Sequence, residues 1–600
     1  MRVCRVRPDV PAVTREFDYL VPETLTDPIG VGTVVRVPLH GRRVRGWVVA
    51  DGVTPATPVG RLVPVHRVVS AGPPAAVVDL ARWAARRWAG PDTAFLRAAS
   101  PPNVVTPTDP VEPAAAVHPV GAPPADLGGS WPDAPVRVVT WPPALDRREL
   151  VLSACAPEGT TLVLVPEPAG AAPLVRAVAR TGRTVLHHHS ALTDRARTQV
   201  WEAARRGAQV VVGGRAAVWL PIPDLAAVVV LDERDEAYQE ERAPTWHARD
   251  VALERARRAG AVVTLVSPVP GPEAAALPGA VRVTPPGRTL RRGWPVLDVV
   301  DLRDEPPRAG VAGEGLGAAV RRAVDADGRA LVVVNRRGRA RLLACRACAT
   351  LARCEVCGAA LAQPDDQLEC GRCGTTRPPV CAACGATSIR AVRPGVHAVR
   401  DEVAALVPRT AVTDVDAETA DLGAAPVLVG TEAVLHRVAR GSVPPVRLVA
   451  FPTFDEELCA LRYRAHEQAL WLLVRAARLL GDRSRGGRLV VQTRMPDHPV
   501  LAVAATGDPD GFLAAETEIR RALAYPPFGA VAEVSGVAAA VTVAADALRA
   551  AGLTVVGGDT GPALVRAATP DALADGIAAA DLGPARARGR LRVAVDPARV

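Results

Sequence analysis

Lysine is missing from the sequence, and all 72 basic residues among the 600 are arginine. This absence excludes chemistry that needs a lysine amine, such as a Schiff base, and it excludes the lysine of a phosphate-binding loop. No uninterrupted apolar run approaches the ~18 residues that span a bilayer, and the first residues lack the apolar stretch of a signal peptide. We therefore expect a cytoplasmic protein that makes no contact with a membrane.

The composition indicates a folded protein of several domains. Six hundred residues exceed the size of one hydrophobic core and predict about four domains. Because 49% of the residues are hydrophobic, disorder of the whole chain is excluded. The net charge of +9 fits a polyanionic partner.

Cysteine is concentrated in one short segment. Eight of the 11 cysteines lie within 40 residues as four Cys-x-x-Cys pairs, a pattern that indicates metal rather than disulfides in a protein without an export signal. Each pair supplies two thiolates from one turn, so two pairs make one tetrahedral zinc site. Four pairs can combine into two sites in three ways, and the loop of 12 residues between the two inner pairs favours a nested arrangement.

The nested arrangement predicts two structural zinc ions per chain, with no position open for a substrate. The outer site takes Cys345, Cys348, Cys381 and Cys384, and the inner site takes Cys354, Cys357, Cys370 and Cys373. The remaining cysteines, Cys4, Cys155 and Cys459, stand alone and are expected to pack in cores.

From about residue 136, short runs of Val and Leu alternate with amphipathic stretches, which predicts parallel sheets buried on both faces. The predicted fold is multidomain α/β. Its parts are a β-rich domain (1–100), a linker with ten prolines (101–135), a first lobe (136–285), a second lobe in two parts (286–342 and 387–509) around a two-zinc module (343–386), and a small α+β domain (510–600). A last strand is expected to align Arg586, Arg588, Arg590 and Arg592 on one face.

Several short stretches, in order along nearly the whole chain, resemble the primosomal protein N′ (PriA) family. They are Phe17–Pro22, Val35–Pro38, Asn335–Gly338, Gln492–Thr493, Pro496–Pro499 and Tyr525–Phe528. The resemblance implies a replication-restart protein with an N-terminal domain for DNA 3′ ends and two RecA-like helicase lobes. It also implies its partners at the nucleoid: forked and single-stranded DNA, other primosome proteins, the replicative helicase or its loader, and single-strand-binding protein.

The helicase motifs depart from this family pattern at several places. Where a glycine-rich loop ending in lysine belongs, residues 147–155 contain neither residue type. The magnesium-binding motif survives in part as Asp232 and Glu233, while the arginine-finger motif has become residues 475–482. Because arginine fingers contribute several orders of magnitude in rate, we predict a degenerate nucleotide site that uses no ATP and has no catalytic residue.

The resemblance places a pocket for a DNA 3′ end around Phe17, Asp18, Tyr19 and Gly41. Asp18 would accept a hydrogen bond from the terminal 3′-hydroxyl, and Phe17 would pack against the last base or sugar. Core packing of a small β domain is the alternative role for both residues.

Arginines also cluster where phosphate contact is expected. Five lie between residues 335 and 346, Arg336 and Arg337 among them, and five more lie between residues 475 and 488. Two other functions remain open. One is an active ATP-dependent 3′–5′ DNA helicase with a non-standard nucleotide site, and the other is a zinc-stabilised protein–protein adaptor.

Overall fold

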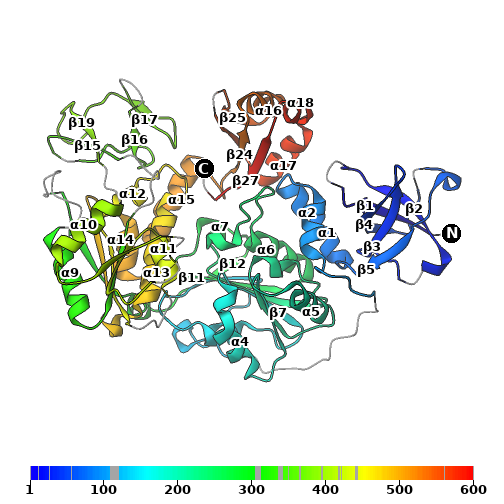
Figure 1. Ribbon diagram of the computed structural model, residues 1–600, viewed down its shortest axis with the longest axis horizontal. Coiled ribbons are helices and arrows are strands. Elements are labelled where there is room, and N and C mark those ends of the chain that lie inside the picture. The colour runs from blue at the N-terminus through cyan, green and yellow to red at the C-terminus, as the bar shows by residue number, and fades with distance from the viewer. Residues whose placement is uncertain are drawn as a thin grey trace.

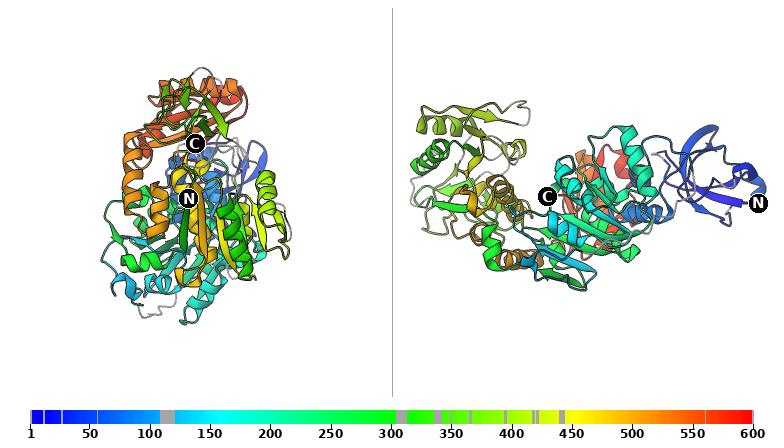
Figure 2. Two further views of the ribbon diagram at one scale, coloured as in Figure 1. Left: turned by 90° about the vertical axis from the view of Figure 1, so that its left-hand side faces the viewer. Right: turned by 90° about the horizontal axis from the view of Figure 1, so that it is seen from below.

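The structure is a computed structural model of the chain, and it describes the following residues: 2–10, 13–25, 28–55, 57–107, 121–303, 313–334, 342–348, 350–363, 367–392, 396–416, 419, 422–438, 444–559 and 561–598. The molecule contains two α/β lobes, and the first of them lies at its centre. The N-terminal β-rich domain, in blue in Figure 1, and the second lobe lie at opposite ends, and Figure 2 shows the same arrangement from two further sides.

The N-terminal domain is an antiparallel sheet in the order β2-β1-β4-β3-β5. Its strands are β1 (Arg2–Pro8), β2 (Phe17–Val21), β3 (Val34–Leu39), β4 (Arg42–Asp51) and β5 (Arg67–Ser70). A bridge between Leu20 and Pro64 closes the sheet on itself around a small apolar core. Two helices follow, α1 (Ala75–Arg87) and α2 (Asp92–Ala99).

The first lobe contains a parallel sheet in the order β12-β6-β11-β10-β7-β9-β8. Its strands are β6 (Val136–Thr140), β7 (Thr160–Leu164), β8 (Val185–His188), β9 (Val210–Gly213), β10 (Leu225–Leu231), β11 (Val262–Ser267) and β12 (Ala280–Val283). Its helices are α3 (Arg148–Ala154), α4 (Ala172–Ala179), α5 (Asp194–Arg205), α6 (Ala248–Ala259), α7 (Pro272–Ala275) and α8 (Gly287–Arg292). Alternate strand residues pack into two separate cores, one with α3 and α4 and the other with α5 and α6, so the sheet is covered on both faces.

The second lobe repeats this design with a parallel sheet in the order β13-β23-β22-β14-β21-β20. Its strands are β13 (Val296–Asp301), β14 (Arg329–Val333), β20 (Val412–Val415), β21 (Val427–Gly430), β22 (Val446–Phe451) and β23 (Arg488–Thr493). Its helices are α9 (Glu314–Asp325), α10 (Val396–Leu406), α11 (Ala433–Arg437), α12 (Asp455–Leu458), α13 (Ala465–Leu480), α14 (Pro499–Thr506) and α15 (Asp510–Ala522).

The cysteine-rich module interrupts the second lobe between β14 and α10 and lies above that lobe in Figure 1. Strands β15 (Leu342–Cys345) and β19 (Ile389–Val392) pair as its antiparallel stem. Strands β16 (Leu361–Ala362), β17 (Leu368–Cys370) and β18 (Thr376–Arg377) form its small second sheet. The predicted fold class, including a module inserted in the second lobe, is therefore confirmed.

The C-terminal domain has an antiparallel sheet in the order β25-β26-β24-β27. Its elements are β24 (Ala530–Gly536), α16 (Ala538–Ala550), β25 (Thr554–Gly557), β26 (Ala563–Ala567), α17 (Pro570–Ala579), α18 (Gly583–Ala587) and β27 (Leu591–Val595). The expected arginine-bearing strand was wrong. Pro584 lies in the first turn of helix α18 and Gly589 turns the chain at φ 144°, so only Arg592 of the four arginines lies in a strand.

One apolar core joins three parts of the chain. It contains Trp47 of β4, residues of α1 and α2, the first-lobe residues Trp201 and Trp219, and Val534 of the C-terminal sheet. This shared core, with the ion pair between Arg87 and Asp596 at 2.5 Å, fixes the N-terminal helices and the C-terminal domain on the first lobe.

Candidate functional site

The carboxyl ends of β6, β10 and β11 meet at one edge of the first lobe, which is where parallel sheets bind ligands. Asp232 follows β10 directly, with a left-handed backbone at φ 58° and 1% of its surface exposed. The loop after β6 runs from Trp141 to Arg147, and residues 148–154 form helix α3. Residues 147–155, which stand where the family has its phosphate loop, are thus mostly helix. The loop that follows β6 consists of residues 141–147.

This loop offers few backbone donors to a phosphate. Pro142 and Pro143 have no N–H. The N–H of Trp141 donates to the Ser267 carbonyl at 2.9 Å, that of Ala144 to the Gly293 carbonyl at 3.2 Å, and that of Leu145 to the Pro142 carbonyl at 3.3 Å. At the five positions from Trp141 to Leu145, the N–H groups that would surround a phosphate in a glycine-rich loop are therefore absent or already bonded.

Two arginines occupy the carboxylate of Asp232. Arg147, at the end of the same loop, bonds its Oδ2 at 2.6 Å, and Arg478 of α13 in the second lobe bonds its Oδ1. Burial by itself raises the pKa of the Asp232 carboxyl, but the two guanidiniums outweigh it and hold the pKa below its usual value. Asp232 is thus a charged carboxylate whose two oxygens both accept from arginine.

Glu233 is also fully engaged, and its surface is 0% exposed. Its Oε2 lies 3.0 Å from the Arg249 guanidinium, and its Oε1 accepts from the N–H of Gly271 at 2.9 Å. A carboxylate held on both oxygens is badly placed to accept a proton from water.

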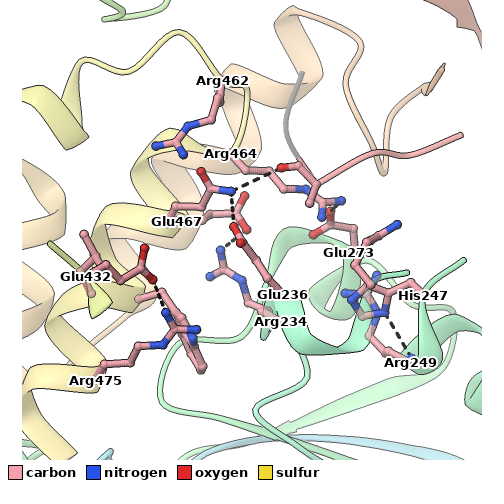
Figure 3. Close-up of a pocket in the computed structure, with 15 residues that line it drawn as sticks. Arg234, Glu236, His247, Arg249, Glu273, Glu432, Arg462, Arg464, Glu467 and Arg475 are labelled. Atoms are coloured by element: carbon pink, nitrogen blue, oxygen red, sulfur yellow. Dashed lines mark hydrogen bonds and ion pairs between the residues drawn. The ribbon is translucent and has the colours of Figure 1, made fainter. Parts of the chain in front are cut away.

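Further ion pairs connect the two lobes around a cavity that is shown in Figure 3. The Asp235 carboxylate accepts from Trp471 Nε1 at 3.0 Å and lies 3.4 Å from Arg475. Arg234 pairs with Glu467. In each pair the first residue follows β10 and the second lies on α13, so a single helix of the second lobe closes the edge of the first.

A second group of contacts lies beside these pairs. Glu273 of α7 pairs with Arg464 at 2.9 Å and with Arg520 of α15 at 2.8 Å. The two arginines, which outweigh the effect of burial, hold the pKa of Glu273 well below its usual value. Removing one partner of a buried ion pair costs about 3–5 kcal/mol, so these contacts oppose separation of the lobes.

Three of the five arginines between residues 475 and 488 form ion pairs within the protein. Arg475 and Arg478 point into the contact between the lobes, and Arg488 pairs with Asp298 at 2.6 Å. Their carboxylate partners lie more than 180 residues away in sequence, except Glu432 beside Arg475. The one sequence signal for these contacts was the presence of Arg475 and Arg478 in the altered arginine-finger motif.

The eight cysteines form two groups, in the nested order, whose sulfur atoms all lie within 4.8 Å of one another. In the outer group Cys345 lies 3.6 Å from Cys384, and in the inner group Cys357 lies 3.5 Å from Cys370. Four sulfurs at 2.3 Å from a central zinc are about 3.8 Å apart, whereas a disulfide needs about 2.05 Å. The donor set and spacing therefore fit one zinc ion in each group.

Local backbone geometry explains how each group is held. Gly358, Gly374 and Gly385 follow three of the four pairs with φ between 72° and 75°, where a side chain would be strained. The N–H groups of these glycines donate to Cys354, Cys370 and Cys381 carbonyls at 2.9 Å.

The module is attached to the second lobe through Arg372, which donates to the Cys357 carbonyl at 2.8 Å and to the Leu461 carbonyl at 3.1 Å. The isolated cysteines differ from these eight. Cys4 and Cys459 are 0% exposed, and burial raises the pKa of each thiol to about 12, so neither forms a thiolate at neutral pH.

The predicted DNA-end residues lie on strand β2 and in the turn between β3 and β4 of the N-terminal domain. Phe17, Asp18 and Tyr19 lie on β2, and Tyr19 donates from its hydroxyl to the Pro38 carbonyl at 2.9 Å. Gly41, at φ 76°, turns the chain between β3 and β4. Asp18 already accepts from Arg5 at 2.8 Å, an interaction that the sequence did not predict. Arg336 and Arg337 lie outside the described residues.

Comparison with known proteins gives the family. A family model described as the 3′DNA-binding domain (3′BD) matches residues 5–101. The protein named "Probable replication restart protein PriA" of Mycobacterium tuberculosis (strain ATCC 25618 / H37Rv) is 30% identical over 593 residues, which cover 90% of this chain and 87% of the relative. The chain belongs to the PriA family.

Other members of the PriA family match over a shorter span. Replication restart protein PriA of Treponema pallidum is 31% identical over 62% of this chain and 58% of its own length. That of Haemophilus influenzae is 28% identical over 57% of this chain and 49% of its own length. The chain thus matches between about half and three fifths of these two relatives.

Solved structures resemble the chain only loosely. S. cerevisiae Dbp5 bound to RNA and ADP BeF3 has a TM-score of 0.33 and 10% identity, over 65% of this chain and 90% of that chain. The DUF1998 helicase MrfA bound to DNA has a TM-score of 0.32 and 11% identity, over 64% of this chain and 53% of that chain. The fold assignment therefore rests on the sheets described above. None of the described helices is both long enough and apolar enough to span a membrane.

Proposed function

We propose that this chain is a replication-restart protein that binds abandoned DNA forks as a scaffold and does not hydrolyse ATP. Family membership and the match to a 3′DNA-binding domain support the DNA part of the proposal. Its partners would be forked and single-stranded DNA and the primosome proteins, with the replicative helicase or its loader and single-strand-binding protein among them.

The contact between Asp232 and two arginines is the observation that carries the absence of hydrolysis. A magnesium ion needs carboxylate oxygens that are free to replace or orient its waters. Here the ion would have to displace Arg147 and then Arg478. It would bring a nucleotide to a loop in which the N–H groups from Trp141 to Leu145 are absent or already bonded.

The two arginines come from different lobes, which makes it hard to free Asp232 for a magnesium ion. Arg478 belongs to the second lobe, so freeing Asp232 also loosens the contact between the lobes. A motor must open and close this contact in each cycle, whereas a scaffold gains from holding it closed. The buried pairs of Arg234 with Glu467 and of Asp235 with Trp471 favour the scaffold for the same reason.

We also propose that the two cysteine groups hold two structural zinc ions. Cys345, Cys348, Cys381 and Cys384 would hold one, and Cys354, Cys357, Cys370 and Cys373 the other. Zinc would supply the folding free energy of this module, whose described residues form sheets of two or three short strands.

The experiment that tests the proposal measures fork binding and Mg·ATP binding on the same preparation. We expect tight binding of a fork with a free 3′ end and no saturable binding of a fluorescent ATP analogue. Saturable Mg-dependent ATP binding would favour the helicase alternative, and absence of fork binding would favour the protein–protein adaptor.

A further inference from the structure

Three arginines lie directly opposite one another across the N-terminal sheet. Arg36 on β3 is the register partner of Arg45 on β4, and it is also the partner of Arg67 on β5. Partners in an antiparallel sheet project from the same face with Cβ atoms about 5 Å apart. The three guanidiniums therefore form a row across three strands, and all three side chains are exposed.

A fourth arginine extends the row along β4. Arg43 is exposed and is paired with Pro38, and it lies two residues from Arg45, so strand alternation puts both on one face. We call these four residues, Arg36, Arg43, Arg45 and Arg67, the arginine face.

The arginine face has no acidic residues to balance it in the described part of the chain. Its members form no ion pair there, and the contact found is that of Arg45 with the ring of Trp47, 5.8 Å from its centroid. Other arginines of the same sheet are neutralised: Arg5 pairs with Asp18 at 2.8 Å and Arg7 with Asp92 at 2.6 Å. Among the described residues, Arg5 and Arg7 are thus paired with carboxylates, whereas the four residues of the arginine face are not.

Like charges directly opposite each other destabilise a sheet. Arg36 faces this repulsion from both sides, because Arg45 and Arg67 flank it. A polyanion with regularly spaced charges removes the repulsion, and the planar guanidinium binds phosphate through two parallel hydrogen bonds. The spacing between strands is about 4.8 Å, which lets adjacent arginines contact successive phosphates of one strand.

The position of the arginine face identifies which polyanion fits it. Arg43, at one end of the arginine face, is the register partner of Pro38. The Pro38 carbonyl accepts from Tyr19, and Gly41 turns the same hairpin, so this end of the face lies beside the proposed pocket for a DNA end. At the other end Trp47 enters the core shared with α1 and the first lobe. The face therefore runs from the pocket towards the lobes.

We propose that the arginine face binds the phosphate backbone of the DNA strand whose 3′ end enters this pocket. The proposal rests on the proposed function, since it gives the strand a path after its terminal nucleotide. These contacts position the strand without reading its sequence.

The test measures affinity of the full-length protein for a single-stranded 3′-hydroxyl oligonucleotide between 50 and 200 mM salt, which are roughly the limits used for counterion analysis. Arg36→Gln should lower the affinity about threefold to tenfold. It should also reduce the slope of log K against log salt concentration by roughly 0.7, which is the contribution of one phosphate contact on single-stranded DNA. Arg36→Lys should keep most of the slope. Arg322→Gln, an exposed arginine of α9 with the same charge change, should behave as wild type.

A stability measurement separates this role from a structural one. Because Arg36→Gln removes repulsion, its Tm should equal or exceed that of wild type while its DNA affinity falls. An unchanged salt slope in Arg36→Gln, or an equal loss in Arg322→Gln, overturns the proposal while the proposed function stands. If the wild-type protein binds no DNA, the proposed function and this inference fail together.

Discussion

Removing the guanidiniums around Asp232 tests whether this carboxylate ties the two lobes together. Arg478→Ala deletes one charge-assisted hydrogen bond, which is worth about 1.5–3 kcal/mol, while Arg147 remains in place 2.6 Å away. Arg147→Ala combined with Arg478→Ala leaves a carboxylate that is 1% exposed without either cation. The expected cost then rises to about 3–5 kcal/mol.

The assay must report local opening, because a chain of several domains does not unfold in two states. Hydrogen exchange of the buried strand β10 (Leu225–Leu231) and of helix α13 (Ala465–Leu480) gives the free energy of opening on each side of the contact. Both elements should lose protection together in Arg478→Ala and more in the double variant.

Arg148→Ala is the matched control. Arg148 is the next residue to Arg147, but its side chain is 49% exposed and it pairs with Asp146, which is 55% exposed. Exposed pairs contribute about 0–1 kcal/mol, so this variant should retain the protection of β10 and α13. The reasoning is refuted if Arg478→Ala changes protection no more than Arg148→Ala does.

Three further predictions concern the metal, the DNA end and pH. Metal analysis should find about two zinc ions per chain, and Cys354→Ser should lose about one and unfold the module locally, because zinc binding is coupled to folding; full zinc content in this variant would exclude Cys354 as a ligand. A fork ending in a 3′-hydroxyl should bind more tightly than the same fork with a 3′-phosphate, and Asp18→Asn should reduce that difference; equal binding of both forks would rule out the pocket. The pKa of His436 is raised to about 9, first by the Glu167 carboxylate of the first lobe, 3.9 Å from its Nδ1, and then by Glu432. Its stabilising contribution is therefore complete below the unfolded pKa of about 6.5 and is lost as the pH rises through about 9. The Tm of wild type should exceed that of His436→Gln at low pH, and the difference should shrink over that interval. A difference that stays constant with pH would show that the pair with Glu167 is not formed.

Regular elements could be predicted from the sequence because their signal is local. Runs such as Val228–Leu231 and Val427–Val429 are apolar on both sides, which indicates a strand covered on both faces, and the cysteine pairs carry their own spacing. The alternation of arginines from Arg586 to Arg592 misled for the same local reason. It follows the period of a strand, but Pro584 and Gly589 impose a helix and a turn.

The interactions around Asp232 could not be predicted because they join residues far apart in sequence. Arg147 lies 85 positions before Asp232 and Arg478 lies 246 after it. The missing lysine and glycines indicate that a phosphate loop is absent, but they do not tell what fills its place. The row of Arg36, Arg45 and Arg67 likewise depends on strand register, which a bulge between Val34 and Val35 shifts by one residue.

ATP turnover in the presence of forked DNA tests the central claim most directly. Wild type and Glu233→Gln are compared at fork concentrations at which both are shown to be bound. The amide oxygen that this substitution introduces can keep the hydrogen bond from the Gly271 N–H, and Arg249 retains Asp250 at 2.8 Å, so fork affinity should be equal. The account predicts turnover at background in both proteins. DNA-stimulated turnover of about one per second in wild type, abolished by Glu233→Gln, would contradict it.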